Sequence, residues 1–67
     1  MSGWHHISTL PATGIVEVLT STGLVRQAQW YNRSARLILM RGHWIRWVKA
    51  KDRNTVYSAR KWRPIDV

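Results

Sequence analysis

The stretch from Leu37 to Lys51 constrains the fold most strongly, because two short apolar runs meet there at a break formed by Arg41-Gly42. Apolar runs of strand length on either side of such a break are typical of two strands joined by a tight turn. Alternation along the second run places side chains on two faces: His43, Ile45, Trp47 and Lys49 on one, and Trp44, Arg46, Val48 and Ala50 on the other. Neither face is wholly apolar, so one of them is a candidate binding surface.

The other segments also favour strands. The predicted strands are Ile15–Thr20, Leu24–Tyr31, Arg36–Met40, His43–Ala50 and Thr55–Ser58. β-Branched residues dominate the first of these, as is typical of strands, and residues that favour turns separate the segments. The predicted fold is therefore all-β, a small antiparallel sheet or an SH3- or OB-like barrel.

An α+β fold with a helix over residues 24–40 is the alternative. Apolar side chains recur at helical spacing from Leu24 to Ile38, and Gly42 is placed to end such a helix. The same segment also fits one face of a strand paired back onto Ile15–Thr20, with Asn32-Arg33-Ser34 as a turn before the next strand. We favour the two strands.

The chain divides into an extended N-terminal arm, residues 1–13, and a single small β domain, residues 14–67. The arm is polar and is broken by Pro11. A 67-residue chain without cysteine has no disulfide to stabilise it, so its five Trp are expected to supply buried surface. The core candidates are Val16, Val18, Ala28, Trp30, Leu37, Leu39 and Val48, with Trp44 or Trp47 contributing according to register.

Positive charge is concentrated after residue 25. The chain carries a net charge of +8, and all 11 Lys and Arg residues lie from Arg26 onward. Such a charge favours polyanionic partners. No apolar run reaches the length of a membrane span and the N-terminus lacks the pattern of a signal peptide, so we expect a cytoplasmic protein without a membrane partner.

The residues of catalytic and metal sites do not form a recognisable pattern. His5, His6 and His43 are the only histidines, and the three carboxylates are scattered. A zinc site normally needs at least three protein ligands, and acid/base catalysis needs suitably placed titratable groups. The sequence therefore predicts no enzyme activity, no metal and no cofactor.

Basic residues interleaved with aromatic residues are the main functional signal. The candidate binding residues are Arg41, Trp44, Arg46, Lys49, Lys51, Arg53, Tyr57 and Arg60. Basic side chains can contact phosphates while an aromatic ring stacks on a base, so the pattern predicts contact with nucleic acid, DNA or RNA. The competing interpretation is that the Trp residues are core and the Lys and Arg residues are a solvated face.

Both ends of the chain carry a motif. Trp4, Ile7, Pro11 and Gly14 form W-x-x-I-x-x-x-P-x-x-G, and Trp62-Arg63-Pro64 forms W-x-P. In these positions the chain resembles a family of small uncharacterised phage and prophage proteins. The resemblance implies a phage origin and a mainly β fold, and it implies no activity. The segment from Arg33 to Arg60 has no counterpart in the pattern, so we expect the particular function to reside there.

Two functions from different classes follow from these observations. The first is a phage-derived module that contacts nucleic acid. The second is a phage accessory protein that binds and modulates an acidic surface of a host protein. The sequence does not decide between DNA, RNA and protein, and it leaves the oligomeric state open, a homo-oligomer included.

Overall fold

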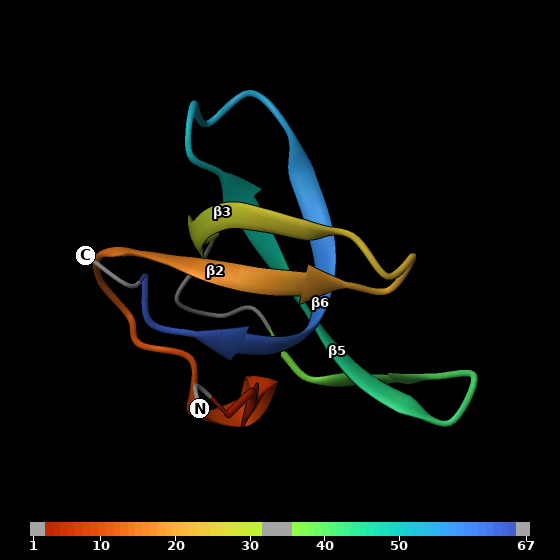
Figure 1. Ribbon diagram of the computed structural model, residues 1–67. Coiled ribbons are helices and arrows are strands. Elements are labelled where there is room, and N and C mark those ends of the chain that lie inside the picture. Colours follow the sequence, from red (N-terminus) through yellow and green to blue (C-terminus); the bar gives the residue numbers. More distant parts are fainter. Residues whose placement is uncertain (1–2, 32–35, 66–67) are drawn as a thin grey trace.

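The fold is a single antiparallel sheet that closes on itself (Figure 1). A computed structural model describes residues 3–31 and 36–65. The strands are β1 (His5–His6), β2 (Ile15–Thr20), β3 (Val25–Trp30), β4 (Ile38–Met40), β5 (His43–Ala50) and β6 (Val56–Arg63), and a 3-10 helix, η1 (Ile7–Thr9), follows β1. The strand order is β1-β6-β2-β3-β5-β4, with a further pairing between β5 and β6. The all-β prediction is confirmed.

The alternative helix over 24–40 is wrong, because β3 and β4 occupy the described ends of that segment. β3 pairs with β2 from Ile15–Gln29 to Leu19–Val25, which satisfies the backbone groups that a helix would otherwise have satisfied within itself. The turn predicted at Asn32-Arg33-Ser34 lies outside the described residues.

The predicted bounds of β2 and β5 are confirmed, whereas the last strand is longer than predicted. The prediction ended it at Ser58, but β6 continues to Arg63. It pairs with β5 through its first half and with β1 and β2 through its second half. The extension of β6 is therefore what closes the sheet.

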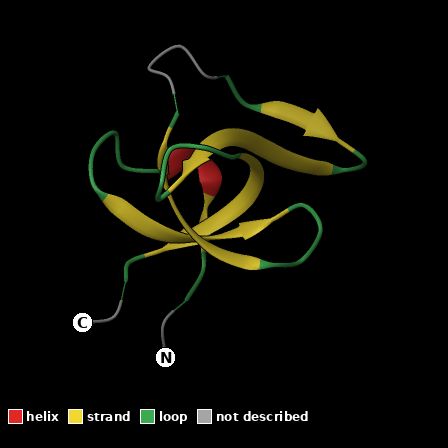
Figure 2. Ribbon diagram, turned by 90° about the horizontal axis from the view of Figure 1, so that it is seen from above, coloured by secondary structure: helices red, strands yellow, loops and turns green. Residues whose placement is uncertain are grey.

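The strands curve around a common interior (Figure 2), and the core residues lie inside it. Cross-strand partners share a face of a sheet, and the pairs Val16–Ala28, Ala28–Ala50, Val48–Tyr57 and Val18–Trp62 run around its inner side. The buried cluster consists of Ile7, Leu10, Val16, Val18, Ala28, Val48 and Ala59, with Trp30, Leu37, Tyr57 and Trp62 packed against it. Val16, Val18, Ala28 and Val48 are thus confirmed as core residues.

Three of the apolar residues expected in the core are exposed. Leu39 is 58% exposed, and the assignment of Trp44 or Trp47 to the core is wrong because these residues are 45% and 39% exposed. Leu39 and Trp44 pair with each other on the β4–β5 hairpin, where β5 has separated from β6. The hairpin extends past the closed part of the sheet, so no opposing layer of the described strands covers these side chains.

Residues 5–10 belong to the packed structure. The segment expected as an extended arm forms β1 and η1, and it places Ile7 and Leu10 in the core. The Nε1–H of Trp62 donates to Oγ1 of Thr9 over 3.0 Å, and the rings of Trp62 and His5 lie 4.7 Å apart between centroids. These contacts attach the segment to β6.

The turn between β4 and β5 is a two-residue hairpin loop, as predicted. Met40 pairs with His43, and the intervening Arg41 and Gly42 have φ values of 51° and 83°. Two consecutive positive φ angles are the pattern of a type I′ turn, whose twist matches that of the flanking strands. The turn places the exposed Arg41 at the tip of the hairpin.

Candidate nucleic-acid interface

A β-bulge in β6 places two cationic side chains next to each other. Thr20 pairs with Ala59 and Leu19 pairs with Lys61, so Arg60 is an extra residue without a partner on β2. Ala59 is buried and Trp62 packs against the core, which leaves both intervening side chains directed away from it. Bulges commonly redirect side chains in this way. Arg60 and Lys61 therefore lie on the outer side of the sheet.

The same part of β6 lies at a fork between two other strands. β5 pairs with β6 as far as Arg46–Ala59, and β1 takes over at His6–Lys61. Beyond this point β5 pairs with β4, and their hairpin projects from the rest of the molecule (Figure 1). Arg60 is thus placed between the β4–β5 hairpin and β1.

Two adjoining hollows lie around Arg60, each with a volume of about 160 Å³. The first is lined by Ser21, Thr22, Met40, Arg41, His43, Ile45 and Arg60. The second is lined by His6, Gly42, His43, Trp44, Arg60 and Lys61. His43 and Arg60 line both, so the hollows are parts of one surface.

We call this surface the basic face and define it by Arg41, His43, Trp44, Arg60, Lys61 and His6. Neither hollow is lined by a carboxylate. Among residues 3–31 and 36–65, the ion pair found is Arg63–Glu17, with 2.8 Å between Nε and Oε1, so Arg41, Arg60 and Lys61 have no acidic partner there. The basic face consequently carries uncompensated positive charge beside an exposed indole ring.

The predicted residues Arg46 and Lys49 lie elsewhere and contact aromatic rings. The guanidinium carbon of Arg46 lies 4.4 Å from the ring centroid of Trp30, and Nζ of Lys49 lies 5.3 Å from that of Tyr31. Arg46 is partly buried, and desolvation lowers its pKa. Its buried Nε has no hydrogen-bond partner in the described structure. These contacts leave both cations less available to a ligand than Arg60.

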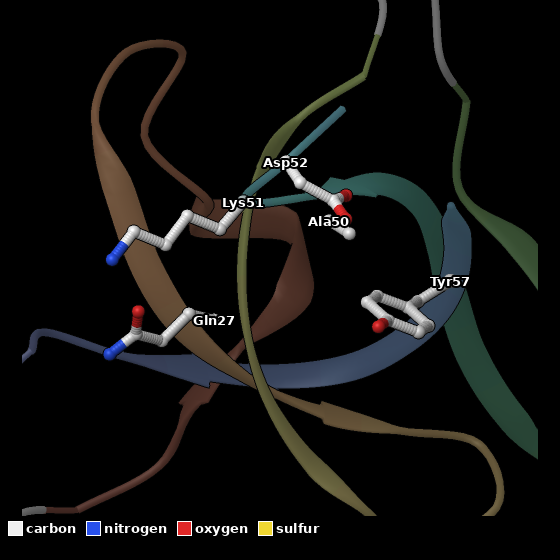
Figure 3. Close-up of a pocket in the computed structure, with 5 residues that line it drawn as sticks. All are labelled: Gln27, Ala50, Lys51, Asp52 and Tyr57. Atoms are coloured by element: carbon white, nitrogen blue, oxygen red, sulfur yellow. The ribbon is translucent and has the colours of Figure 1, made fainter. Parts of the chain in front are cut away.

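The remaining predicted residues lie at the other end of β5. Lys51 and Arg53 belong to the β5–β6 turn, and Tyr57 packs against the core. An open hollow of about 440 Å³ here is lined by Gln27, Ala50, Lys51, Asp52 and Tyr57 (Figure 3). Asp52 adds negative charge to this hollow. An eight-residue strand spans roughly 25 Å, so this end does not form one compact site with Arg41 and Trp44.

The structure thus brings together three of the eight predicted residues, Arg41, Trp44 and Arg60, and adds residues that the sequence did not indicate. Lys61 and His6 were missed because both depend on the second half of β6. His43 was not among the candidate binding residues, although it lines both hollows. The sequence did contain one signal for this site. Arg60 and Lys61 are consecutive polar residues, which break the alternation of a strand, and such a break is typical of a β-bulge.

The structure offers no direct indication of a metal site or a membrane span within its described ranges. No group of three or more His, Asp or Glu residues there could hold a metal ion. No helix in the described residues is long and apolar enough to cross a membrane.

Comparisons with protein-family models, with curated protein sequences and with solved structures find no match to this chain. The resemblance to phage and prophage proteins, based on the motifs at the two ends, accordingly stays a prediction.

Proposed function

We propose that this chain is a small nucleic-acid-binding module that contacts phosphates through the basic face. The observation that carries the proposal is the convergence of Arg41, Arg60 and Lys61 on two adjoining hollows that no carboxylate lines. Phosphate contacts supply much of the affinity of nucleic-acid-binding proteins, and arginine can pair with a phosphate through two N–H groups at once. The net charge of +8 would also attract the ligand over a distance.

The first hollow has further groups that suit a phosphate. The hydroxyl-bearing residues Ser21 and Thr22 of the β2–β3 turn line it together with Arg41 and Arg60. Hydroxyl and guanidinium groups are both common donors to phosphate oxygens. Ser21 is held against β6, since its backbone N–H donates to the carbonyl oxygen of Ser58 over 2.7 Å. The hydroxyl of Ser21 also hydrogen-bonds that of Ser58, and the hydroxyl of Thr22 that of Thr20, so each can donate to a phosphate where it accepts in its internal bond.

Docking on an acidic surface of another protein is the second candidate function, and the β4–β5 hairpin favours it. Ile38, Leu39 and Met40 are all exposed on β4, next to the basic face. Apolar residues beside a charged rim are typical of protein interfaces. A phage accessory protein directed at a host protein would use such a surface. Binding to nucleic acid and binding to a protein differ in how strongly the affinity depends on salt and in how many residues share the binding energy.

The salt dependence of binding tests the nucleic-acid proposal. Each neutralised phosphate contributes a slope of about −0.9 for duplex DNA, or −0.7 for single strands, to a plot of log binding constant against log salt concentration. Arg60→Ala and Lys61→Ala should each weaken binding. Each should also reduce the magnitude of the slope by roughly the contribution of one phosphate contact. Fluorescence anisotropy with labelled DNA and RNA oligonucleotides, measured from about 50 to 200 mM salt, gives both quantities.

Lys51→Ala is the matched control, because it removes the same charge at the opposite end of β5. It should leave the slope nearly unchanged. An equal effect of Lys51→Ala and Lys61→Ala would show that the basic face is not the site. If neither duplex nor single strands bind at low salt, the nucleic-acid proposal is wrong. Docking on a protein would then be supported if the chain captures a protein from a lysate that has been treated with nuclease, and if one or two substitutions at the hairpin abolish this capture.

A further inference from the structure

The second hollow differs from an ordinary phosphate site because Trp44 is one of the residues that line it. Trp44 lines it from β5, Arg60 and Lys61 line it from β6, and the imidazole-bearing residues His6 and His43 complete it. The hollow lies at the fork where β5 leaves β6 and β1 begins to pair. Its volume of about 160 Å³ is that of roughly five water molecules at ~30 Å³ each. This is room for one small planar ring system.

Trp44 is also the Trp residue best placed to receive a ligand. The ring of Trp30 lies under the guanidinium group of Arg46, and that of Trp4 lies 4.3 Å from the guanidinium carbon of Arg63. The ring of Trp62 contacts His5. Trp44 is 45% exposed, and within the described part of the chain its ring makes no aromatic stacking or cation–π contact.

The fifth Trp residue provides a comparison on the same strand. Trp47 is exposed to a similar extent, but it pairs with Ser58 and lines neither hollow of the basic face. Trp44 therefore lies beside the cations of the basic face, and Trp47 lies outside that face. The combination of a positively charged groove with a stacking ring is what proteins that hold single-stranded nucleic acid use.

We infer that the ligand of the basic face is single-stranded nucleic acid, with one base entering the second hollow to stack on Trp44 while Arg60 and Lys61 contact the flanking phosphates. The inference rests on the proposed function and narrows it to one class of nucleic acid. In a duplex, bases are stacked on their neighbours and present only their edges, so a base cannot reach this ring unless it leaves the stack. Unpaired bases have free faces that can stack on aromatic side chains.

A strand without bases separates stacking from electrostatic attraction. The affinities of three labelled ligands would be measured by anisotropy: a 12-nucleotide thymidine strand, an abasic strand of the same length and charge, and a duplex. The unsubstituted protein should bind the thymidine strand more tightly than the abasic strand. Trp44→Ala should weaken binding of the thymidine strand by about 5- to 150-fold, the range measured for loss of one base stack. It should leave binding of the abasic strand and the duplex unchanged.

Two further variants make this result specific. Trp44→Phe keeps an aromatic ring and should retain most of the affinity for the thymidine strand, while Trp47→Ala should behave as the unsubstituted protein. Circular dichroism and melting of Trp44→Ala should match those of the unsubstituted protein, because its side chain lies outside the core.

The outcomes distinguish this inference from the proposed function. Equal affinity of the unsubstituted protein for the thymidine and abasic strands would overturn the inference, as would equal loss of both in Trp44→Ala. In either case an effect of Arg60→Ala on the salt slope would still support the proposed function. Absence of binding to every ligand at low salt would overturn both.

Discussion

Replacing Ile7 with alanine is expected to lower the free energy of unfolding by about 2–5 kcal/mol. Ile7 is fully buried in η1, and η1 packs against β5 and β6. Truncation removes apolar contacts and leaves a cavity that these strands can fill only by shifting. A domain of 67 residues has little stability to spare, so a loss in the upper part of this range would leave much of the protein unfolded at room temperature.

Urea or thermal denaturation followed by circular dichroism measures this effect. Leu39→Ala is the control, since it also shortens an apolar side chain but at an exposed position on β4. It should change the free energy of unfolding by no more than about 0.5 kcal/mol. A cost below about 1 kcal/mol for Ile7→Ala would contradict the prediction. Residues 1–13 would then behave as an arm that the sheet does not need.

Replacing Trp30 with alanine is expected to cost about 3 kcal/mol, the lower end of the usual range for a large aromatic residue because Trp30 is only partly buried. Its ring packs against the buried cluster, opposite Val48 on β5. The ring also covers the guanidinium group of Arg46. The substitution thus removes core contacts and leaves a partly desolvated cation without its aromatic partner.

Arg46→Met is the informative comparison for this site. Methionine keeps a long apolar stem against Trp30 and removes a partly buried charge, an exchange that is often neutral or stabilising. We therefore expect a change of less than about 1 kcal/mol in unfolding free energy and no change in nucleic-acid affinity. If Trp30→Ala left melting unchanged but weakened nucleic-acid binding, Trp30 and Arg46 would belong to the binding surface after all.

The central strands were predictable because their side chains follow the local rules of sheets. β2 is rich in β-branched residues between two glycines, and Val16 and Val18 alternate toward the core. The alternation assigned to β5 also holds, with Val48 and Ala50 buried on one side and Ile45 on the other. Local pattern sufficed for β2, whose two faces have clearly different burial. It did not suffice for β5, which has buried and exposed residues on both faces, and the fully buried Ile45 was not among the core candidates.

The ends of the chain were harder to predict because their structure depends on distant partners. The segment from Arg60 to Arg63 has charged side chains at three of its four positions, and the bulge interrupts its alternation. It forms a strand only because β1 and β2 supply hydrogen-bond partners from the other end of the chain. β1 itself is two residues long and has no recognisable pattern.

The candidate site was predicted in part for the same reason. Composition identified basic and aromatic residues, but it could not show that Arg46 lies over the ring of Trp30 or that Lys51 lies at the far end of β5. The exposure of Trp44 depends on where β5 leaves β6, which is a property of the whole sheet. Which of these side chains come together in space depends on the pairing register of the strands, and a local stretch of sequence does not determine that register.

The closed sheet also has a consequence for the folding rate and for amide exchange. β6 pairs with β5, its neighbour in sequence, but also with β1 and β2 from the opposite end of the chain. Contacts between distant segments slow folding, so this chain should fold in milliseconds to seconds, as small β proteins with similar topologies do.

No strand of the ring β2-β3-β5-β6 can separate without breaking two pairings. Amide protons in the ring should therefore exchange together through global unfolding. Those of β4, for which β5 is the one partner among the described strands, should exchange sooner through local opening.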